Sequence, residues 1–137
     1  MTTRAFVDTN VFVYLFDGDS PRKQARAREI ISREAGAIVL STQVLQEFYV
    51  TVTRKLAVPL DPADAEEATR DLSAFDVVTV DVPLILRAIA LARVSKISMW
   101  DALIIESAID SGCDRLLTED LQTGQVFGSL LVENPFT

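Results

Sequence analysis

Short apolar runs recur along the chain, and a stretch with helical periodicity separates each run from the next. The runs lie within residues 4–7, 37–40, 115–118 and 130–132, and residues 75–80 contain a further predicted strand. Uninterrupted apolar runs of this length are typical of strands that are buried on both faces of a parallel sheet. Strands that alternate with helices predict an α/β fold, in which the helices cover the sheet.

Residues that start and stop helices mark the segments between these strands. Ser20 precedes Pro21, which fits an N-cap followed by proline at the first helical position. Gly36 follows the same segment and is typical of a left-handed helix end. Comparable signals predict helices over residues 11–16, 21–35, 43–56, 62–74, 83–94 and 98–112.

Acidic residues stand where strands end and helices begin. Asp8 follows the first predicted strand, and Asp120 follows the fourth. Right-handed crossovers bring the carboxyl ends of parallel strands to one edge of the sheet, where ligands bind. Asp101 stands at a predicted helix start, three residues after Ser98, and Glu47 lies in the second turn of another helix. These four acids are therefore candidates for one shared site.

Each of the four acids also has an ordinary structural explanation. Asp8 and Asp101 are suited to capping helices, since Asp is a common residue at and near helix starts. Asp120 fits a turn, and Glu47 fits a solvated helix face. The sequence pattern alone leaves both explanations open.

A cluster of four carboxylates needs a counter-charge. Two like charges about 4 Å apart repel by about 4 kcal/mol at an effective dielectric near 20, so such a cluster takes up protons or binds a cation. Oxygen ligands suit Mg²⁺ or Mn²⁺ rather than zinc. One or two such ions support the in-line displacement of a phosphoryl group. The candidate chemistry is therefore hydrolysis or transfer at phosphorus.

The composition excludes several other kinds of site. The 137 residues contain no histidine, which removes Ser-His-Asp and Cys-His catalysis and the usual zinc sites. The five glycines form no phosphate-binding loop motif. The single Cys113 cannot form an internal disulfide, which suits the cytosol. No secretory signal and no apolar run of about 20 residues is visible, so we expect a single cytoplasmic domain over residues 1–137 that does not enter a membrane.

Charge is distributed unevenly along the chain. The net charge is −7, but residues 1–60 carry +2 and residues 61–137 carry −9. Basic residues concentrate between positions 22 and 33, and Arg22, Lys23 and Arg26 are candidate contacts to substrate phosphates. A solvated helix face with ordinary ion pairs explains the same cluster equally well.

Four segments, in this order, carry a family resemblance: Val7–Asn10, the helix with Glu47, Trp100–Ile104 and Thr118–Leu121. Together they resemble the PIN-domain ribonucleases, and within these the VapC toxins of bacterial toxin–antitoxin pairs. The resemblance covers essentially the whole chain. Four motifs in order and at matching spacing are far more specific than any one of them.

The resemblance implies a fold and a site. The fold is a Rossmann-like three-layer sandwich with a central parallel sheet of four to five strands in the order 3-2-1-4-5. The site is a set of carboxylates that hold Mg²⁺ or Mn²⁺ and hydrolyse RNA, with Asp8 and Asp101 as the most direct ligands. Glu119 adjoins the site, but the motif alignment favours Asp120. The residues implied in catalysis are Asp8, Glu47, Asp101 and Asp120, and those implied in orienting them are Thr9, Asn10 and Thr118.

The resemblance further implies a homodimer and a small antitoxin whose C-terminal tail covers the active-site groove. Two other interpretations stay open. A phosphotransfer protein on a receiver-like or haloacid-dehalogenase-like fold is one, although Asn10 stands where such a phosphatase has a second aspartate. A non-catalytic RNA-binding module that uses the basic helix is the other.

Overall fold

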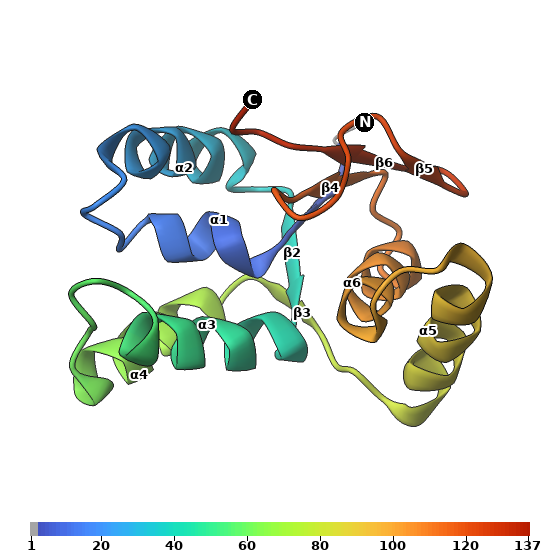
Figure 1. Cartoon of the computed structure of the whole chain (residues 1–137), viewed down its shortest axis with the longest axis horizontal. Helices are drawn as coiled ribbons and strands as arrows, with labels where there is room; N and C mark the ends of the chain where they lie inside the picture. The colour runs from blue at the N-terminus through green and yellow to red at the C-terminus, as the bar shows by residue number, and fades with distance from the viewer. Residues whose placement is uncertain (1–2) are drawn as a thin grey trace.

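A central sheet runs through the computed structural model, which describes residues 3–137 (Figure 1). Five of the six strands are parallel, and the spatial order is β3-β2-β1-β4-β6-β5. Only β5 pairs antiparallel, as one arm of a hairpin with β6. The strands are β1 (Ala5–Val7), β2 (Ile38–Ser41), β3 (Asp76–Val78), β4 (Arg115–Leu117), β5 (Val126–Phe127) and β6 (Leu130–Glu133).

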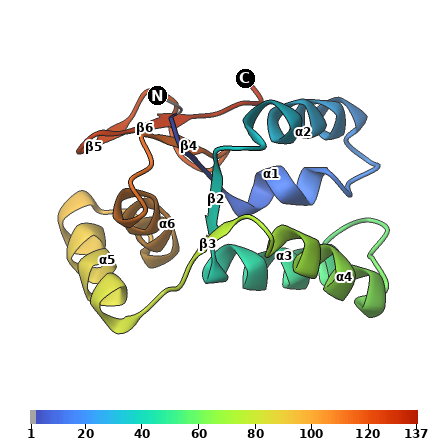
Figure 2. The same ribbon diagram turned by 180° about the vertical axis from the view of Figure 1, so that it is seen from behind.

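Helices cover both faces of the sheet (Figures 1 and 2). The chain moves from β1 through β2 to β3 in one direction, so right-handed crossovers place the helices of these two connections on one face. It then returns from β3 to β4, and the last two helices lie on the opposite face. None of the helices described within residues 3–137 is long and apolar enough to cross a bilayer. The helices are α1 (Thr9–Tyr14), α2 (Pro21–Glu34), α3 (Thr42–Arg54), α4 (Pro62–Leu72), α5 (Val82–Ser95) and α6 (Met99–Asp110).

The predicted sheet is confirmed, with one strand added. The strand expected over 130–132 lies beside β4, as predicted, but it is the sixth strand in the chain and not the fifth. The added strand, β5, has only two residues, so it carries no periodicity that could predict it. Gly128 makes the turn of the hairpin, and its φ of 63° favours glycine.

Burial explains why the sequences of β1 and β2 are apolar without alternation, since every residue of both strands is buried. β1 is fully buried because α1 and α3 lie on one side of the sheet and α6 on the other. Phe6, Phe12 and Phe48 are among the largest side chains with no solvent exposure. They anchor β1, α1 and α3 to one core, and this packing fixes the positions from which the site residues project.

A bidentate ion pair fastens β4 to the end of α2. The Arg115 guanidinium donates to both Glu34 carboxylate oxygens, at 2.8 and 2.9 Å, and the Glu34 side chain is only 10% exposed. Hydrogen bonds from Arg115 hold the pKa of Glu34 below its usual value. A carboxyl group with a lowered pKa stabilises the fold above its unfolded pKa, and this stabilisation is lost as pH falls through the folded pKa.

Replacing Glu34→Gln therefore lowers the free energy of unfolding at pH 7 by about 1.5–3 kcal/mol, because it removes charged hydrogen bonds. The difference from the wild type shrinks as pH falls below about 4.5. Glu29→Gln is the matched control, since Glu29 pairs with Arg26 in an exposed position and its loss costs less than about 1 kcal/mol. Urea unfolding of both variants at pH 3.5 and pH 7 measures their free energies of unfolding. An equal loss of stability in the two variants at pH 7 would contradict the prediction.

Candidate active site

Asp8 is a buried carboxylate at the junction of β1 and α1. It is only 5% exposed. Its Oδ1 accepts the backbone N–H of Thr9 at 2.7 Å, and its Oδ2 accepts the hydroxyl of Thr118 at 2.7 Å. The first bond caps α1, so the capping explanation holds for Asp8. The second bond joins it to the segment after β4, which a helix cap does not require.

Thr118 links Asp8 to Asp120. The fully buried Thr118 Oγ1 donates to Asp8 and also accepts the backbone N–H of Asp120 at 3.0 Å. The Asn10 amide approaches the same oxygen at 3.4 Å, and the Asn10 carbonyl accepts the backbone N–H of Glu119 at 3.3 Å. These bonds hold the turn after β4 against the start of α1, because β1 and β4 are neighbours in the sheet.

Glu47 reaches the site from α3. Its Oε1 accepts the Thr9 hydroxyl at 3.0 Å, and its Oε2 lies 3.4 Å from the amide nitrogen of Gln43. The same Gln43 nitrogen donates to the backbone carbonyl of Trp100 at 3.3 Å. Glu47 is therefore held on the side that faces α1 and α6, rather than on a solvated helix face.

Asp101 lies in the first turn of α6 and is half-buried. Its backbone N–H donates to the hydroxyl of Ser98 at 3.0 Å, which is the Ser98 half of the predicted capping box. Burial raises the pKa of the Asp101 carboxyl, and the charge of Asp120 raises it further. The structure thus places Asp101 within electrostatic reach of Asp120.

Charge interactions link the four carboxylates through Asp8 and Asp120. Burial raises the pKa of Asp8 to about 7, and the charges of Asp120 and Glu47 add to the rise, while the bonds from Thr118 and Thr9 oppose it. None of the four carboxylates has a Lys or Arg nitrogen within 4 Å in the described part of the chain. None of these carboxylates is therefore neutralised by a direct ion pair in this part of the chain.

The donor set fits a hard divalent ion in its chemistry. The candidate ligands are all carboxylate oxygens, which Mg²⁺ and Mn²⁺ prefer. Within residues 3–137, no three His, Cys, Asp or Glu side chains are placed together to hold one ion. Mg²⁺ is commonly held by one or two carboxylates, with water and substrate phosphate supplying the remaining ligands. The arrangement is compatible with that kind of site and not with an all-protein cage.

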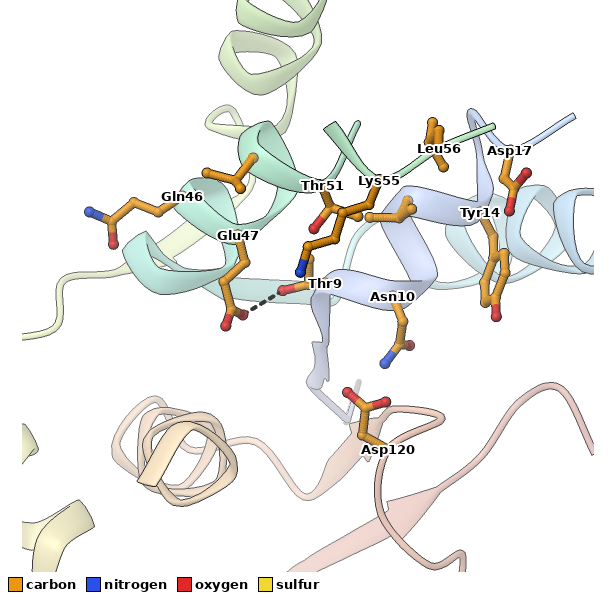
Figure 3. A pocket seen from close by; sticks show the side chains of 12 residues that line it. Thr9, Asn10, Tyr14, Asp17, Gln46, Glu47, Thr51, Lys55, Leu56 and Asp120 are labelled. Carbon is orange, nitrogen blue, oxygen red and sulfur yellow. Dashed lines mark hydrogen bonds between the residues drawn. The ribbon is translucent and has the colours of Figure 1, made fainter. Parts of the chain in front are cut away.

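A cleft opens beside these carboxylates. Its volume is about 600 Å³, and its walls come from α1, α3 and the turn after β4. Figure 3 shows Glu47 and Asp120 projecting into it from opposite sides. The residues that line it are Thr9, Asn10, Val13, Tyr14, Asp17, Gln46, Glu47, Val50, Thr51, Lys55, Leu56 and Asp120.

Glu119 is paired with residues outside this group of carboxylates. Its carboxylate pairs with the Lys23 ammonium at 2.7 Å and accepts the hydroxyl of Tyr14. Burial raises the pKa of the Tyr14 hydroxyl, and hydrogen bonds to Glu119 raise the pKa of Lys23. The Lys23 ammonium also lies 4.9 Å from the centre of the Tyr14 ring. Glu119 thus has cationic and hydroxyl partners, whereas Asp120 faces the cleft.

The basic cluster predicted in the sequence is partly neutralised. Lys23 is paired with Glu119, and Arg26 bonds to Glu29 and to the backbone carbonyl of Pro135. Arg22 lines a second hollow, of about 340 Å³, next to the C-terminal segment. Of the three candidate phosphate contacts, Arg22 alone forms no ion pair to another residue in the described range 3–137.

Comparison with known families identifies the fold that carries this site. The PIN domain model matches residues 5–126. The chain belongs to the PIN domain family. No curated protein matches the chain by sequence.

Solved structures of toxin–antitoxin proteins share the PIN fold of this chain. A toxin–antitoxin complex from Klebsiella pneumoniae is 22% identical with a TM-score of 0.72, covering 96% of this chain and 97% of the other. The FitAB complex bound to a DNA fragment is 20% identical with a TM-score of 0.71, covering 97% and 96%. VapC20 of Mycobacterium tuberculosis, a toxin that cleaves the sarcin–ricin loop, is 20% identical with a TM-score of 0.66, covering 82% and 86%. At these identities the likeness establishes the fold.

Two residues near the PIN-domain site, Gln43 and Tyr14, were not predicted from the sequence to have a role there. Gln43 stands four residues before Glu47, and this helical spacing is the one signal that could have linked the two. Tyr14 meets Glu119 across 105 residues, so no local pattern could reveal it. Lys23 was predicted to contact phosphate, and its pairing with Glu119 across 96 residues leaves no local pattern either.

The raised pKa of Asp8 has a consequence for stability. An acid whose folded pKa lies above its unfolded value destabilises the fold as pH rises from the unfolded value, near 3.8, to the folded value, near 7. Asp8→Asn removes that penalty. We expect its Tm to exceed that of the wild type by an amount that grows between pH 4 and pH 7 and is constant above pH 7.

Differential scanning calorimetry in metal-free buffer across this pH range measures the difference. Asp71→Asn is the control, since Asp71 is exposed on α4 and forms no ion pair within residues 3–137. A gain that is independent of pH, or equal in both variants, would show that Asp8 is not buried in its charged form at neutral pH.

Proposed function

We propose that this PIN domain is a cytoplasmic endoribonuclease that depends on Mg²⁺ or Mn²⁺ and is the toxin of a toxin–antitoxin pair. The observation that carries the proposal is the position of Asp8 and Asp120 at the point where the strand order of the sheet reverses, with Glu47 acting on the pKa of Asp8 and Asp120 acting on the pKa of Asp101. Ligand sites of open α/β sheets lie at this point. The PIN family match and the toxin–antitoxin neighbours support the same activity.

Asp8 and Asp101 are the residues that we expect to hold the ion most directly, with Glu47 and Asp120 beside them. When bound, a divalent ion supplies positive charge that stabilises the attacking and leaving oxygens of an in-line displacement at phosphorus. The protein contributes fixed carboxylates. The Thr9 N–H and the Thr118 hydroxyl fix Asp8, and Thr9 and Gln43 fix Glu47, so the ligands need little reorganisation.

Asp8→Asn and Asp101→Asn each lower RNA cleavage by more than the roughly 10- to 100-fold that is typical of losing an outer partner of a metal ligand. EDTA removes the activity, and Mn²⁺ restores it in the wild type. Mn²⁺ also raises the Tm of the wild type but not that of Asp8→Asn, because only a bound ion shifts the folding equilibrium. Cleavage of a labelled RNA and thermal unfolding of the same samples provide the measurements.

Adjacent acids provide the matched control for this prediction. Asp120→Asn loses activity, whereas Glu119→Gln retains most of it, because Glu119 is paired with Lys23 and is not among the residues that line the cleft. Full activity of the wild type in EDTA would contradict the proposed function. Tight RNA binding without cleavage in Mg²⁺ and Mn²⁺ would favour the non-catalytic interpretation.

The same proposal includes two protein partners, a cognate antitoxin over the cleft and a second copy of the chain. The antitoxin is supported by neighbours that are themselves toxin–antitoxin complexes. The homodimer is supported by an apolar stripe on α5. Val82, Leu86 and Ile89 follow one face of this helix at helical spacing, and they are 66%, 61% and 42% exposed.

Leu86→Glu is expected to convert the dimer to a monomer, because it places a charge in the centre of the stripe. Val94→Glu is the control, since Val94 is 83% exposed on the same helix but lies off the stripe. Sedimentation velocity at micromolar concentration separates the two states. A wild-type monomer, or equal behaviour of the two variants, would contradict the homodimer.

A further inference from the structure

Lys55 stands apart from the other basic residues near the site. It follows α3 directly and lines the same cleft as Glu47 and Asp120. It is the one basic side chain among the described residues of the cleft wall. Its backbone N–H bonds to the Thr51 carbonyl, but its ammonium forms no ion pair with any acid in residues 3–137.

The direction of the Lys55 side chain matters for its role. Figure 3 shows it directed into the cleft, towards the end that holds Thr9 and Glu47. The charged groups that share the wall with it are acidic, namely Asp17, Glu47 and Asp120. A substrate phosphate that enters this cleft meets negative charge on most sides, and Lys55 supplies positive charge at the wall.

The remainder of the cleft suits a nucleotide. Val13, Val50 and Leu56 provide an apolar part of the wall. The volume of about 600 Å³ falls in the range of about 300–1,000 Å³ that is usual for small-molecule pockets. These apolar side chains are available to contact the base of a nucleotide whose phosphate is held at Lys55.

We propose that Lys55 binds the phosphate that adjoins the scissile phosphodiester of the RNA, so that Lys55 sets the position of the strand in the cleft. The inference rests on the proposed ribonuclease function. In this arrangement the carboxylates act at one phosphate, and Lys55 holds the next one along the strand. Lys55 is a substrate-binding residue and not part of the carboxylate cluster.

A structural role for Lys55 has to be separated from this one. Basic residues are favourable near helix C-terminal ends, where they interact with the helix dipole. Arg54 occupies the last turn of α3 and offers the same interaction. Both side chains are exposed, but only Lys55 lines the cleft. Arg54→Ala is therefore the matched control for Lys55→Ala.

The kinetic experiment uses a single-stranded RNA oligonucleotide that the full-length protein cuts at one bond. Lys55→Ala is expected to raise KM about tenfold, the loss of one charge-assisted hydrogen bond, with kcat changed by less than about twofold. It also lowers the slope of log KM against log salt by about 0.7. Lys55→Arg restores most of the KM. Arg54→Ala leaves KM unchanged, and equal effects of Arg54→Ala and Lys55→Ala would overturn the inference.

A modified substrate locates the phosphate. An uncharged methylphosphonate replaces the linkage on one side or the other of the cleaved bond. At one of the two positions it raises the wild-type KM about tenfold and has little further effect on Lys55→Ala. If the methylphosphonate at each position raises the KM of Lys55→Ala as much as it raises the KM of the wild type, Lys55 contacts neither phosphate. If Lys55→Ala fails to fold, the wild type alone tests the inference. A wild-type KM that neither methylphosphonate substitution raises would then overturn it.

Failure of this inference and failure of the proposed function are distinguishable. Cleavage by the wild type with an unchanged KM in Lys55→Ala overturns the role of Lys55 and leaves the ribonuclease function standing. Absence of cleavage in Mg²⁺ and Mn²⁺ overturns the ribonuclease function. Fluorescence anisotropy with the same oligonucleotide then decides whether Lys55 binds RNA, since equal affinity of wild type and Lys55→Ala would exclude it.

Discussion

The hydrogen bond between the Thr118 hydroxyl and the Asp8 carboxylate is the interaction on which the site depends. It joins the ends of β1 and β4, which belong to opposite ends of the sequence, at 2.7 Å and without solvent exposure of Thr118. Burial of a carboxylate is costly unless its oxygens find donors. Thr118 and the Thr9 N–H provide two donors, yet the pKa of Asp8 still rises to about 7 because burial outweighs them.

The strand order explains why that bond can form. β1 lies between β2 and β4, and the chain leaves β1 in one direction and returns on its other side. The helices that follow β1 and β2 therefore begin at the same edge at which β4 ends. Asp8 caps α1, Glu47 lies in the second turn of α3 and Asp101 lies in the first turn of α6. Topology therefore places these acids from distant parts of the chain at the same edge of the sheet.

Much of the fold and part of the site could be predicted from the sequence. Uninterrupted apolar runs predicted the parallel strands, and Ser98 predicted the start of α6, because both signals are local. The orientation of Glu47 could not be predicted, since it depends on contacts with Thr9 and Gln43 that form only in the tertiary structure. The pairing of Lys23 with Glu119 spans 96 residues and likewise leaves no local trace.

Charge pairing separates structural acids from the candidate catalytic ones. Glu34, Glu106 and Glu119 are partly buried, and each lies within 4 Å of an Arg or Lys nitrogen. The four acids at the sheet edge have no such partner in the described part of the chain, and two of them, Asp8 and Asp101, have raised pKa values. An uncompensated cluster reduces the stability of the fold, so the arrangement is understandable if a ligand brings the missing positive charge. Glu119 and Asp120 show this contrast in adjacent positions. Glu119 forms an ion pair with Lys23, whereas Asp120 has no ion pair in the described residues and lines the cleft.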